Sequence, residues 1–164
     1  MKNRWLFLLL FALVPLVVGC QQTTTRYLGA TAAREDVVRL STLQGEQQRW
    51  QDTYVTIDYT VKQQGGKLAL DGTFAFSFSP QINYTQVLDF KVKFFLLDKD
   101  LKVVAYQEIV RTLSTHLEDT APFSYTFDLP ENVVALTFGY EGYFRDSDEG
   151  GGGGSVVKYP KINP

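Results

Sequence analysis

Three features of the sequence carry side chains that are able to do chemistry. Cys20 is the only cysteine, and its thiol lies just after an apolar segment. His116 is the only histidine and so the only imidazole available as a general base near neutral pH. Asp146, Asp148 and Glu149 stand directly before five consecutive glycines, where carboxylate oxygens could wrap a calcium ion. The segments around these residues decide which chemistry is available to them.

Cys20 closes a short apolar N-terminal segment. Lys2 and Arg4 precede residues 5–18, a run without charge that is interrupted only by Pro15. This order, basic and then apolar, is that of a secretory leader. The run is too short to cross roughly 30 Å of bilayer hydrocarbon, which takes about 20 apolar residues. The segment therefore predicts export rather than a membrane-spanning helix.

Residues 17–20, Val-Val-Gly-Cys, resemble the lipobox of bacterial lipoproteins. The resemblance covers only residues 1–20. It implies that a diacylglycerol is attached to the Cys20 sulfur, that cleavage falls just before Cys20, and that the new amine is often acylated. Gln21 after the cysteine implies passage to the outer membrane, or to the external face of the plasma membrane in an organism with one membrane. The alternative is that Cys20 is an ordinary residue, after a secretory or mitochondrial leader or inside a buried first helix.

The charge of the mature chain excludes some classes of partner. The full chain has 16 basic and 18 acidic residues, and loss of the leader removes two basic ones, which leaves a net charge of −4. An acidic domain without a Lys/Arg cluster lacks the footprint of a nucleic-acid binder. The sequence also shows no basic patch for anionic lipid headgroups, so the lipid on Cys20 is the expected membrane contact. No cofactor is expected.

We expect one folded domain. The sequence has no second cysteine for a disulfide, and a mature chain of about 145 residues is long enough to bury its own core. The expected organisation is a signal peptide at 1–19, a lipidated tether at 20–30 and the domain at 31–164. Within 31–43, apolar residues recur three and four positions apart, which predicts one short amphipathic helix. Residues 37–43 could instead form an edge strand.

From residue 53 onward, apolar residues recur at every second position, which is the period of a half-buried strand. Turn sequences separate these runs and predict three β-hairpins, at 55–78, 86–110 and 123–140, with a seventh strand at 156–159. The inward faces predict one shared core, made of Val55, Ile57, Tyr59, Phe74, Phe76, Phe90, Val92, Phe94, Leu136 and Phe138.

This succession of strands predicts an all-β fold, an antiparallel β-sandwich of immunoglobulin-like or transthyretin-like type. Parallel βαβ units are disfavoured because the region lacks crossover helices. A small up-and-down β-barrel is the alternative, since long strands with one apolar face are also able to close around a ligand. The outward faces carry Thr, Ser, Lys, Asp and Gln, which argues against a membrane-spanning barrel.

The acidic and glycine-rich stretch at 146–155 has two interpretations. Asp146, Asp148 and Glu149 are the candidate ligands of a Ca²⁺ ion. Their spacing lacks the order of acidic positions found in a defined calcium loop, and consecutive glycines have much backbone entropy to lose on ordering. We therefore expect a mobile, solvated loop without a metal site.

Aromatic residues gather near the C-terminal end of the sequence and suggest a binding surface. Phe138 and Tyr140 are assigned to the core by their alternation. Tyr143 falls off that face, and Tyr143 and Tyr159 are the candidates for a surface that contacts a sugar, a peptide or a protein. Gly139 and Gly142 lie in the same predicted strand and predict a bulge or a close approach of backbone there.

Catalysis has little support in the sequence. No nucleophile elbow and no second histidine accompany His116, which is predicted to be a solvated loop side chain. Asp58 and Asp71 are carboxylates of the kind that a glycosidase pairs, but both lie on predicted outward strand faces. The expected function is therefore non-enzymatic.

Three classes of function remain, in order of preference. The first is a lipid-anchored envelope lipoprotein whose sandwich binds another envelope protein as an assembly accessory. The second is a ligand- or carbohydrate-binding lipoprotein, and the third is a hydrolase built on His116. A protein-binding module should show an exposed strand edge or an apolar patch, whereas a ligand binder should gather tyrosines and acids at one end of the sandwich.

Overall fold

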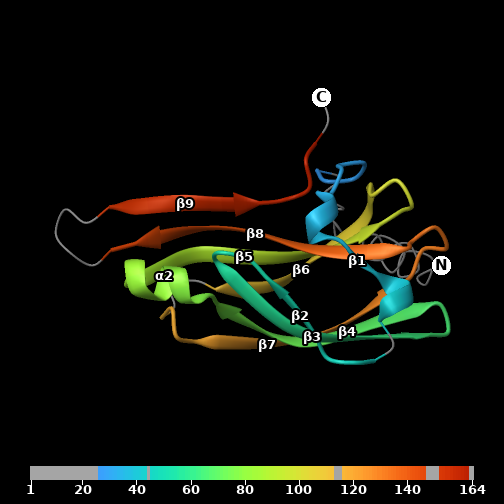
Figure 1. Ribbon diagram of the computed structural model, residues 1–164, viewed down its shortest axis with the longest axis horizontal. Coiled ribbons are helices and arrows are strands. Elements are labelled where there is room, and N and C mark those ends of the chain that lie inside the picture. The colour runs from blue at the N-terminus through green and yellow to red at the C-terminus, as the bar shows by residue number, and fades with distance from the viewer. Residues whose placement is uncertain (1–25, 44, 113–115, 147–151, 163–164) are drawn as a thin grey trace, which may run out of the picture.

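The computed structural model describes residues 26–43, 45–112, 116–146 and 152–162. These residues form two antiparallel sheets that pack face to face as an all-β sandwich, which confirms the predicted fold class (Figure 1). Among the described strands, neither sheet closes on itself, so the alternative of a closed barrel is wrong.

The larger sheet has five strands in the order β1-β8-β5-β6, and β9 also pairs with β8; the smaller sheet has the order β2-β3-β4-β7. The strand bounds are β1 Val38–Arg39, β2 Gln48–Gln51, β3 Val55–Gln64, β4 Lys67–Phe76, β5 Gln86–Leu97, β6 Val103–Thr112, β7 Thr120–Asp128, β8 Ala135–Arg145 and β9 Gly153–Lys158. The 3-10 turn η2 Arg34–Asp36 precedes β1, the 3-10 turn η3 Leu40–Thr42 follows β1, and the α-helix α2 Phe78–Asn83 connects β4 to β5.

Two of the three predicted hairpins are confirmed. Strands β3 and β4 pair from Val55 with Phe76 to Gln64 with Lys67, and β5 pairs with β6. Gly65 and Gly66 connect β3 to β4 with φ of 59° and 73°, a left-handed backbone that glycine adopts without steric cost.

The third predicted hairpin is wrong. Strand β7 pairs with β4 in the smaller sheet, and β8 pairs with β5 in the larger sheet. The turn after Leu129 therefore carries the chain from one sheet to the other rather than back along the same sheet. Alternation in a sequence says which face of a strand is buried, but it does not say which strand lies beside it.

The predicted core is confirmed. Every residue of the predicted set belongs to one cluster of buried side chains between the two sheets. Ile57, Phe74, Phe90 and Phe94 are no more than 1% exposed. Trp50 of β2 also joins this cluster, and its ring packs on Phe138 at 5.7 Å between centroids.

The predicted amphipathic helix at 31–43 is wrong. This segment forms η2, the two-residue strand β1 and η3, and Val38 pairs with Leu136 at the edge of β8. The alternative of an edge strand within 37–43 comes closer, since β1 lies there. Backbone pairing with the free edge of β8 outweighs the modest helical preference of so short a segment.

The folded domain begins before the predicted boundary at residue 31. Tyr27 and Ala30 are buried at 3% and 1% exposure, and they pack on the outer face of the larger sheet. They form a second cluster with Phe95, which follows the core residue Phe94 and therefore points to the opposite face of the sheet. The N-terminal segment therefore covers a sheet face that alternation alone predicts to be solvated.

Two further sequence predictions concern single positions in the strands. Phe78 does not continue β4, because it begins helix α2 and is 74% exposed. The expected close approach at the glycines of β8 is confirmed: a side chain at Gly142 would meet the ring of Phe90, and one at Gly139 would meet the Lys158 carbonyl.

Candidate functional site

The structure describes only some of the residues that the sequence singles out as candidates for lipid attachment or metal binding. Cys20, Asp148 and Glu149 lie outside the described residues. Asp146 is described at the end of β8, where its N–H donates to the Gly152 carbonyl at 3.2 Å. Within the described parts of the chain, no three His, Cys, Asp or Glu side chains are grouped so that they could hold a metal ion.

The prediction of a mobile loop over residues 146–155 is wrong at its C-terminal end, because β9 already begins at Gly153. Gly153, Gly154 and Ser155 belong to β9 and pair with Arg145, Phe144 and Tyr143 of β8. Glycine has a low strand propensity, but pairing along β8 holds these residues extended. The polyglycine run is thus partly a strand.

Tyr143 and Tyr159 do not share one aromatic surface. Tyr143 is 40% exposed on the outer face of the larger sheet, as expected of a surface residue. Tyr159 instead packs in the second cluster, with its ring 4.8 Å from that of Tyr27, and its hydroxyl accepts a hydrogen bond from Lys93 Nζ at 2.9 Å. Burial raises the pKa of Tyr159. Tyr159 is therefore a packing residue.

The candidate catalytic groups are dispersed. His116 is exposed in the turn before β7. Arg49 Nε donates to Asp58 Oδ1 at 2.6 Å, and this hydrogen bond lowers the pKa of Asp58. Asp71 accepts a hydrogen bond from Ser124 Oγ at 2.6 Å. Asp58 and Asp71 thus each have a hydrogen-bond partner on the outer face of the smaller sheet. Neither of these two hydrogen bonds involves His116.

The outer edge of β9 is the clearest candidate for an interaction site. Strand β9 pairs with β8 on one side, and no other described strand pairs with it. In Figure 1 it forms the border of the larger sheet at the top of the molecule. Sequence reasoning predicted the strand but not that it ends the sheet.

The direction of the backbone groups along β9 is set by its neighbours. Thr85 N–H donates to the Arg145 carbonyl at 3.1 Å, so the Arg145 backbone faces β5, while Asp146 faces β9 through its bond to Gly152. Successive residues of a strand direct these groups to opposite sides. Gly153 pairs with Arg145, whose backbone groups face away from β9, so the N–H and C=O groups of Gly153 face the open edge. The same holds for Ser155 and Val157, which follow at every second position.

The β9 edge lacks the features by which sheets protect their edges. Charged side chains, prolines and bulges keep edge strands from pairing with other chains. Strand β7, an edge of the smaller sheet, contains Pro122. Strand β9 carries no proline and no charge before Lys158, and Val157 is 70% exposed.

A polar cluster fixes the C-terminal end of β9. Lys158 Nζ lies 2.8 Å from Asp36 Oδ1 and 3.6 Å from Asp52 Oδ2, and it sits over the Trp50 ring at 5.3 Å. The Tyr140 hydroxyl donates to Asp52 Oδ2 at 2.6 Å. We call Asp36, Asp52, Tyr140 and Lys158 the edge cluster. It joins the larger sheet to the smaller one beside β9.

The electrostatics of the edge cluster favour a structural role. Burial alone would lower the pKa of Lys158, but the carboxylates of Asp36 and Asp52 outweigh it, and the pKa is raised. Burial and the hydrogen bond to Asp52 raise the pKa of Tyr140. Lys158 is thus held as a cation and Tyr140 as a neutral phenol, and neither is available as a base near neutral pH.

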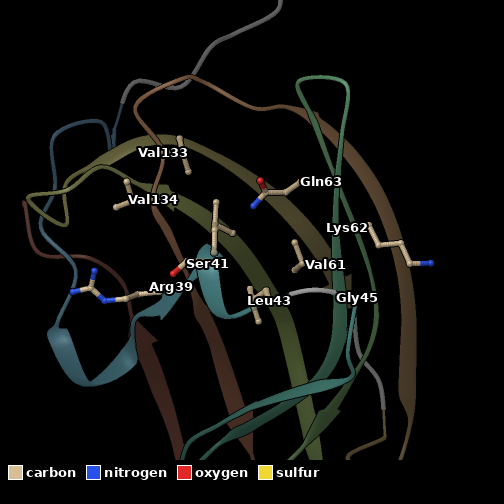
Figure 2. Close-up of a pocket in the computed structure, with 10 residues that line it drawn as sticks. Arg39, Ser41, Leu43, Gly45, Val61, Lys62, Gln63, Val133 and Val134 are labelled. Atoms are coloured by element: carbon tan, nitrogen blue, oxygen red, sulfur yellow. The ribbon is translucent and has the colours of Figure 1, made fainter.

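A groove of about 900 Å³ opens at one end of the sandwich (Figure 2). It lies between η3, the end of β3 and the segment that leads into β8. Its lining is apolar at Leu40, Leu43, Val61, Val133 and Val134, with Arg39, Ser41, Lys62 and Gln63 among the polar residues around it. In Figure 2 the Lys62 side chain points away from the hollow.

These features define an all-β sandwich with an unprotected edge strand and an apolar end groove. Comparison with protein-family models, curated proteins and solved structures returns no match for the chain. No helix among the described residues has the length and apolar character needed to cross a bilayer.

Proposed function

We propose that the chain is a lipid-anchored, non-enzymatic envelope lipoprotein whose sandwich binds another envelope protein by strand addition to β9. The observation that carries this proposal is the open β9 edge. An extended segment of a partner pairs with such an edge through main-chain hydrogen bonds, and alternate side chains then supply specificity.

The side chains beside the edge suit a protein partner. On the outer face of the larger sheet, Val157 lies across from Glu141, and Tyr143 lies across from Ser155. A strand added outside β9 would place its side chains next to exposed Val157 and Ser155. Exposed apolar and hydroxyl groups beside unpaired backbone provide the contact area that pairing alone lacks.

Ser155→Pro tests strand addition. Proline removes an N–H that faces the open edge, so pairing with β8 stays in place while pairing with a partner is lost. Ser155→Ala keeps that N–H and is the matched control. Affinity purification from the detergent-solubilised envelope should recover a stoichiometric partner with the wild-type chain and with Ser155→Ala, but not with Ser155→Pro. Equal recovery from both variants, with unchanged thermal midpoints, would overturn the β9 proposal.

The anchor is a separate part of the proposal and rests on the lipobox resemblance at Cys20. Two acyl chains hold a protein at a membrane where one holds it only marginally. Cys20→Ser should therefore release the protein from the membrane or leave an unprocessed precursor. Unchanged membrane retention, together with no acyl mass on the wild-type N-terminus, would rule the anchor out.

The end groove favours ligand or carbohydrate binding as the second candidate function. Its volume of about 900 Å³ and its apolar lining resemble those of small-molecule sites. A ligand seated there should be blocked by Val134→Trp, because Val134 lines the groove and is 39% exposed. A rise of the thermal midpoint with a sugar or an apolar ligand, lost in Val134→Trp, would favour this candidate over strand addition.

A further inference from the structure

A second, smaller hollow lies beside the N-terminal segment. It has a volume of about 320 Å³ and is lined by Arg34, Val37, Arg39, Lys99 and Leu101. Two stretches of chain far apart in sequence build it, the segment around η2 and β1 and the turn between β5 and β6. We call it the basic pocket.

Backbone hydrogen bonds hold these two stretches together. The Ala32 N–H donates to the Leu101 carbonyl at 2.9 Å, and the Val103 N–H donates to the Ala30 carbonyl at 2.8 Å. Within the turn, Asp98 Oδ1 accepts hydrogen bonds from the N–H groups of Asp100 and Lys102, both at 2.9 Å. The basic pocket is therefore part of the ordered fold.

The charge of the basic pocket is unbalanced. Its three charged residues, Arg34, Arg39 and Lys99, are all cations, and no acidic residue is in its lining. None of the three forms an ion pair with a described residue, whereas cations elsewhere do, such as Arg49 with Asp58. Glu35, Asp98 and Asp100 belong to the same two stretches of chain but are not among the lining residues, so the lining that an anion would contact carries only cationic donors.

The chemistry of the lining indicates what kind of anion fits. Guanidinium groups bind phosphate or carboxylate oxygens through paired hydrogen bonds, and an ammonium group adds a point charge. Val37 and Leu101 add an apolar wall, and both are only partly exposed. The basic pocket thus suits a phosphate that is attached to a carbon skeleton.

The N-terminal connection places this pocket near a membrane if Cys20 is lipidated, so a lipid ligand for the pocket rests on the proposed function. The chain joins the second cluster at Tyr27, and the stretch from Cys20 to Tyr27 reaches at most about 25 Å when fully extended. The segment that begins at Tyr27 runs directly into the basic pocket. We propose that Arg34, Arg39 and Lys99 bind the headgroup phosphate of an anionic phospholipid in the membrane that carries the anchor.

This inference revises the expectation, drawn from the sequence, that the domain has no basic patch for lipid headgroups. Arg34 and Lys99 are 65 positions apart, and pairing of the N-terminal segment with the β5–β6 turn brings them to one pocket. A linear scan for runs of Lys and Arg does not detect such a site.

The test uses the full-length protein purified from membranes in a nonionic detergent. Short-chain phosphatidylglycerol, short-chain phosphatidylcholine and inorganic phosphate are each titrated, and bound ligand is counted by native mass spectrometry. The triple variant Arg34→Gln/Arg39→Gln/Lys99→Gln should bind phosphatidylglycerol on the order of 100-fold more weakly, since each basic side chain contributes roughly fivefold near an anionic surface.

The matched control removes three other exposed cations and has the same net charge, Lys67→Gln/Arg111→Gln/Arg145→Gln. It should bind phosphatidylglycerol like the wild-type chain, and phosphatidylcholine should bind weakly to all three proteins. Equal loss in both variants would show a nonspecific charge effect and overturn the proposal. So would tighter binding of inorganic phosphate than of phosphatidylglycerol, which would assign the basic pocket to a soluble ligand.

The same mass spectra separate this inference from the proposed function. An acylated Cys20 with no preference for phosphatidylglycerol would overturn the pocket and leave the anchor standing. A free Cys20 thiol would remove the anchor, and with it the reason for a lipid as the ligand.

Discussion

At the scale of single residues, polar side chains with several partners hold the two sheets together. Asp52 is the central example. Its Oδ1 accepts hydrogen bonds from the N–H groups of Tyr54 and Val55 at 2.8 and 3.0 Å, and its Oδ2 accepts one from the Tyr140 hydroxyl. A carboxylate that joins β2, β3 and β8 in this way belongs to the framework of the domain.

Replacing Asp52 with alanine should therefore lower the free energy of unfolding by about 2–4 kcal/mol, because several partly buried donors lose their acceptor. Tyr140→Phe removes one hydroxyl and should cost about 1 kcal/mol. Tyr143→Phe, at an exposed tyrosine of the same strand, is the control and should be close to neutral. Urea unfolding measures all three, and an Asp52→Ala effect below about 0.5 kcal/mol would contradict this role.

Core truncation gives a second prediction at this scale. Phe94→Ala should lower the free energy of unfolding by about 3–5 kcal/mol, since a fully buried ring is removed from between the sheets. Phe78→Ala is the matched control, because Phe78 is 74% exposed. If urea unfolding gave similar small effects for both, the burial of the Phe94 side chain between the two sheets would be wrong.

At the scale of elements, the sequence predicts strands better than it predicts their partners. Alternation identifies β3, β4, β5 and β8 because a half-buried strand exposes every second residue. It misassigns the segment from β7 to β8 as a hairpin, since a turn between two sheets has the same local chemistry as a turn within one. It misses β2 and offers β1 only as the alternative of an edge strand within 37–43, because both strands are too short to show a period.

The candidate sites were less accessible to sequence analysis than the fold. The open edge of β9 depends on which strand ends the sheet, and the edge cluster joins Asp36, Asp52 and Lys158 from three distant segments. One local signal was present for β9. Residues 153–157 contain neither proline nor charge, which is unusual for a strand at an edge.

The segment between β8 and β9 carries a prediction at the element scale. We expect that added Ca²⁺ leaves the thermal midpoint unchanged, because the acidic spacing there does not match a calcium loop. A ligand that binds only the folded state would raise the midpoint by mass action. A calcium-dependent rise that Asp146→Ala abolishes would assign a metal site to this segment instead.

At the scale of the whole molecule, buried phenols link stability to alkaline pH. Burial raises the pKa of Tyr59 to about 12 and also raises the pKa values of Tyr27, Tyr140 and Tyr159. A phenol that holds its proton more tightly when folded stabilises the fold at pH below the unfolded pKa. That contribution is lost as pH rises through the folded pKa.

The free energy of unfolding should therefore fall as pH rises above about 10, the pKa of a tyrosine in an unfolded chain. The raised pKa of Lys158 acts in the same direction. Phenolate absorbance during titration checks this prediction, and these four tyrosines should ionise late, together with unfolding. Complete ionisation of all nine tyrosines near pH 10 without unfolding would show that they are not buried.

We propose that the open edge of β9 receives a strand from another envelope protein. Site-specific photocrosslinking in the native envelope tests it most directly, with the crosslinker at Val157 and a control at Tyr125 in β7, an edge strand of the smaller sheet. We expect one discrete crosslinked partner from Val157, lost when Ser155→Pro is added, and no such partner from Tyr125. The absence of any adduct at Val157, or the same adduct from both positions, would contradict it.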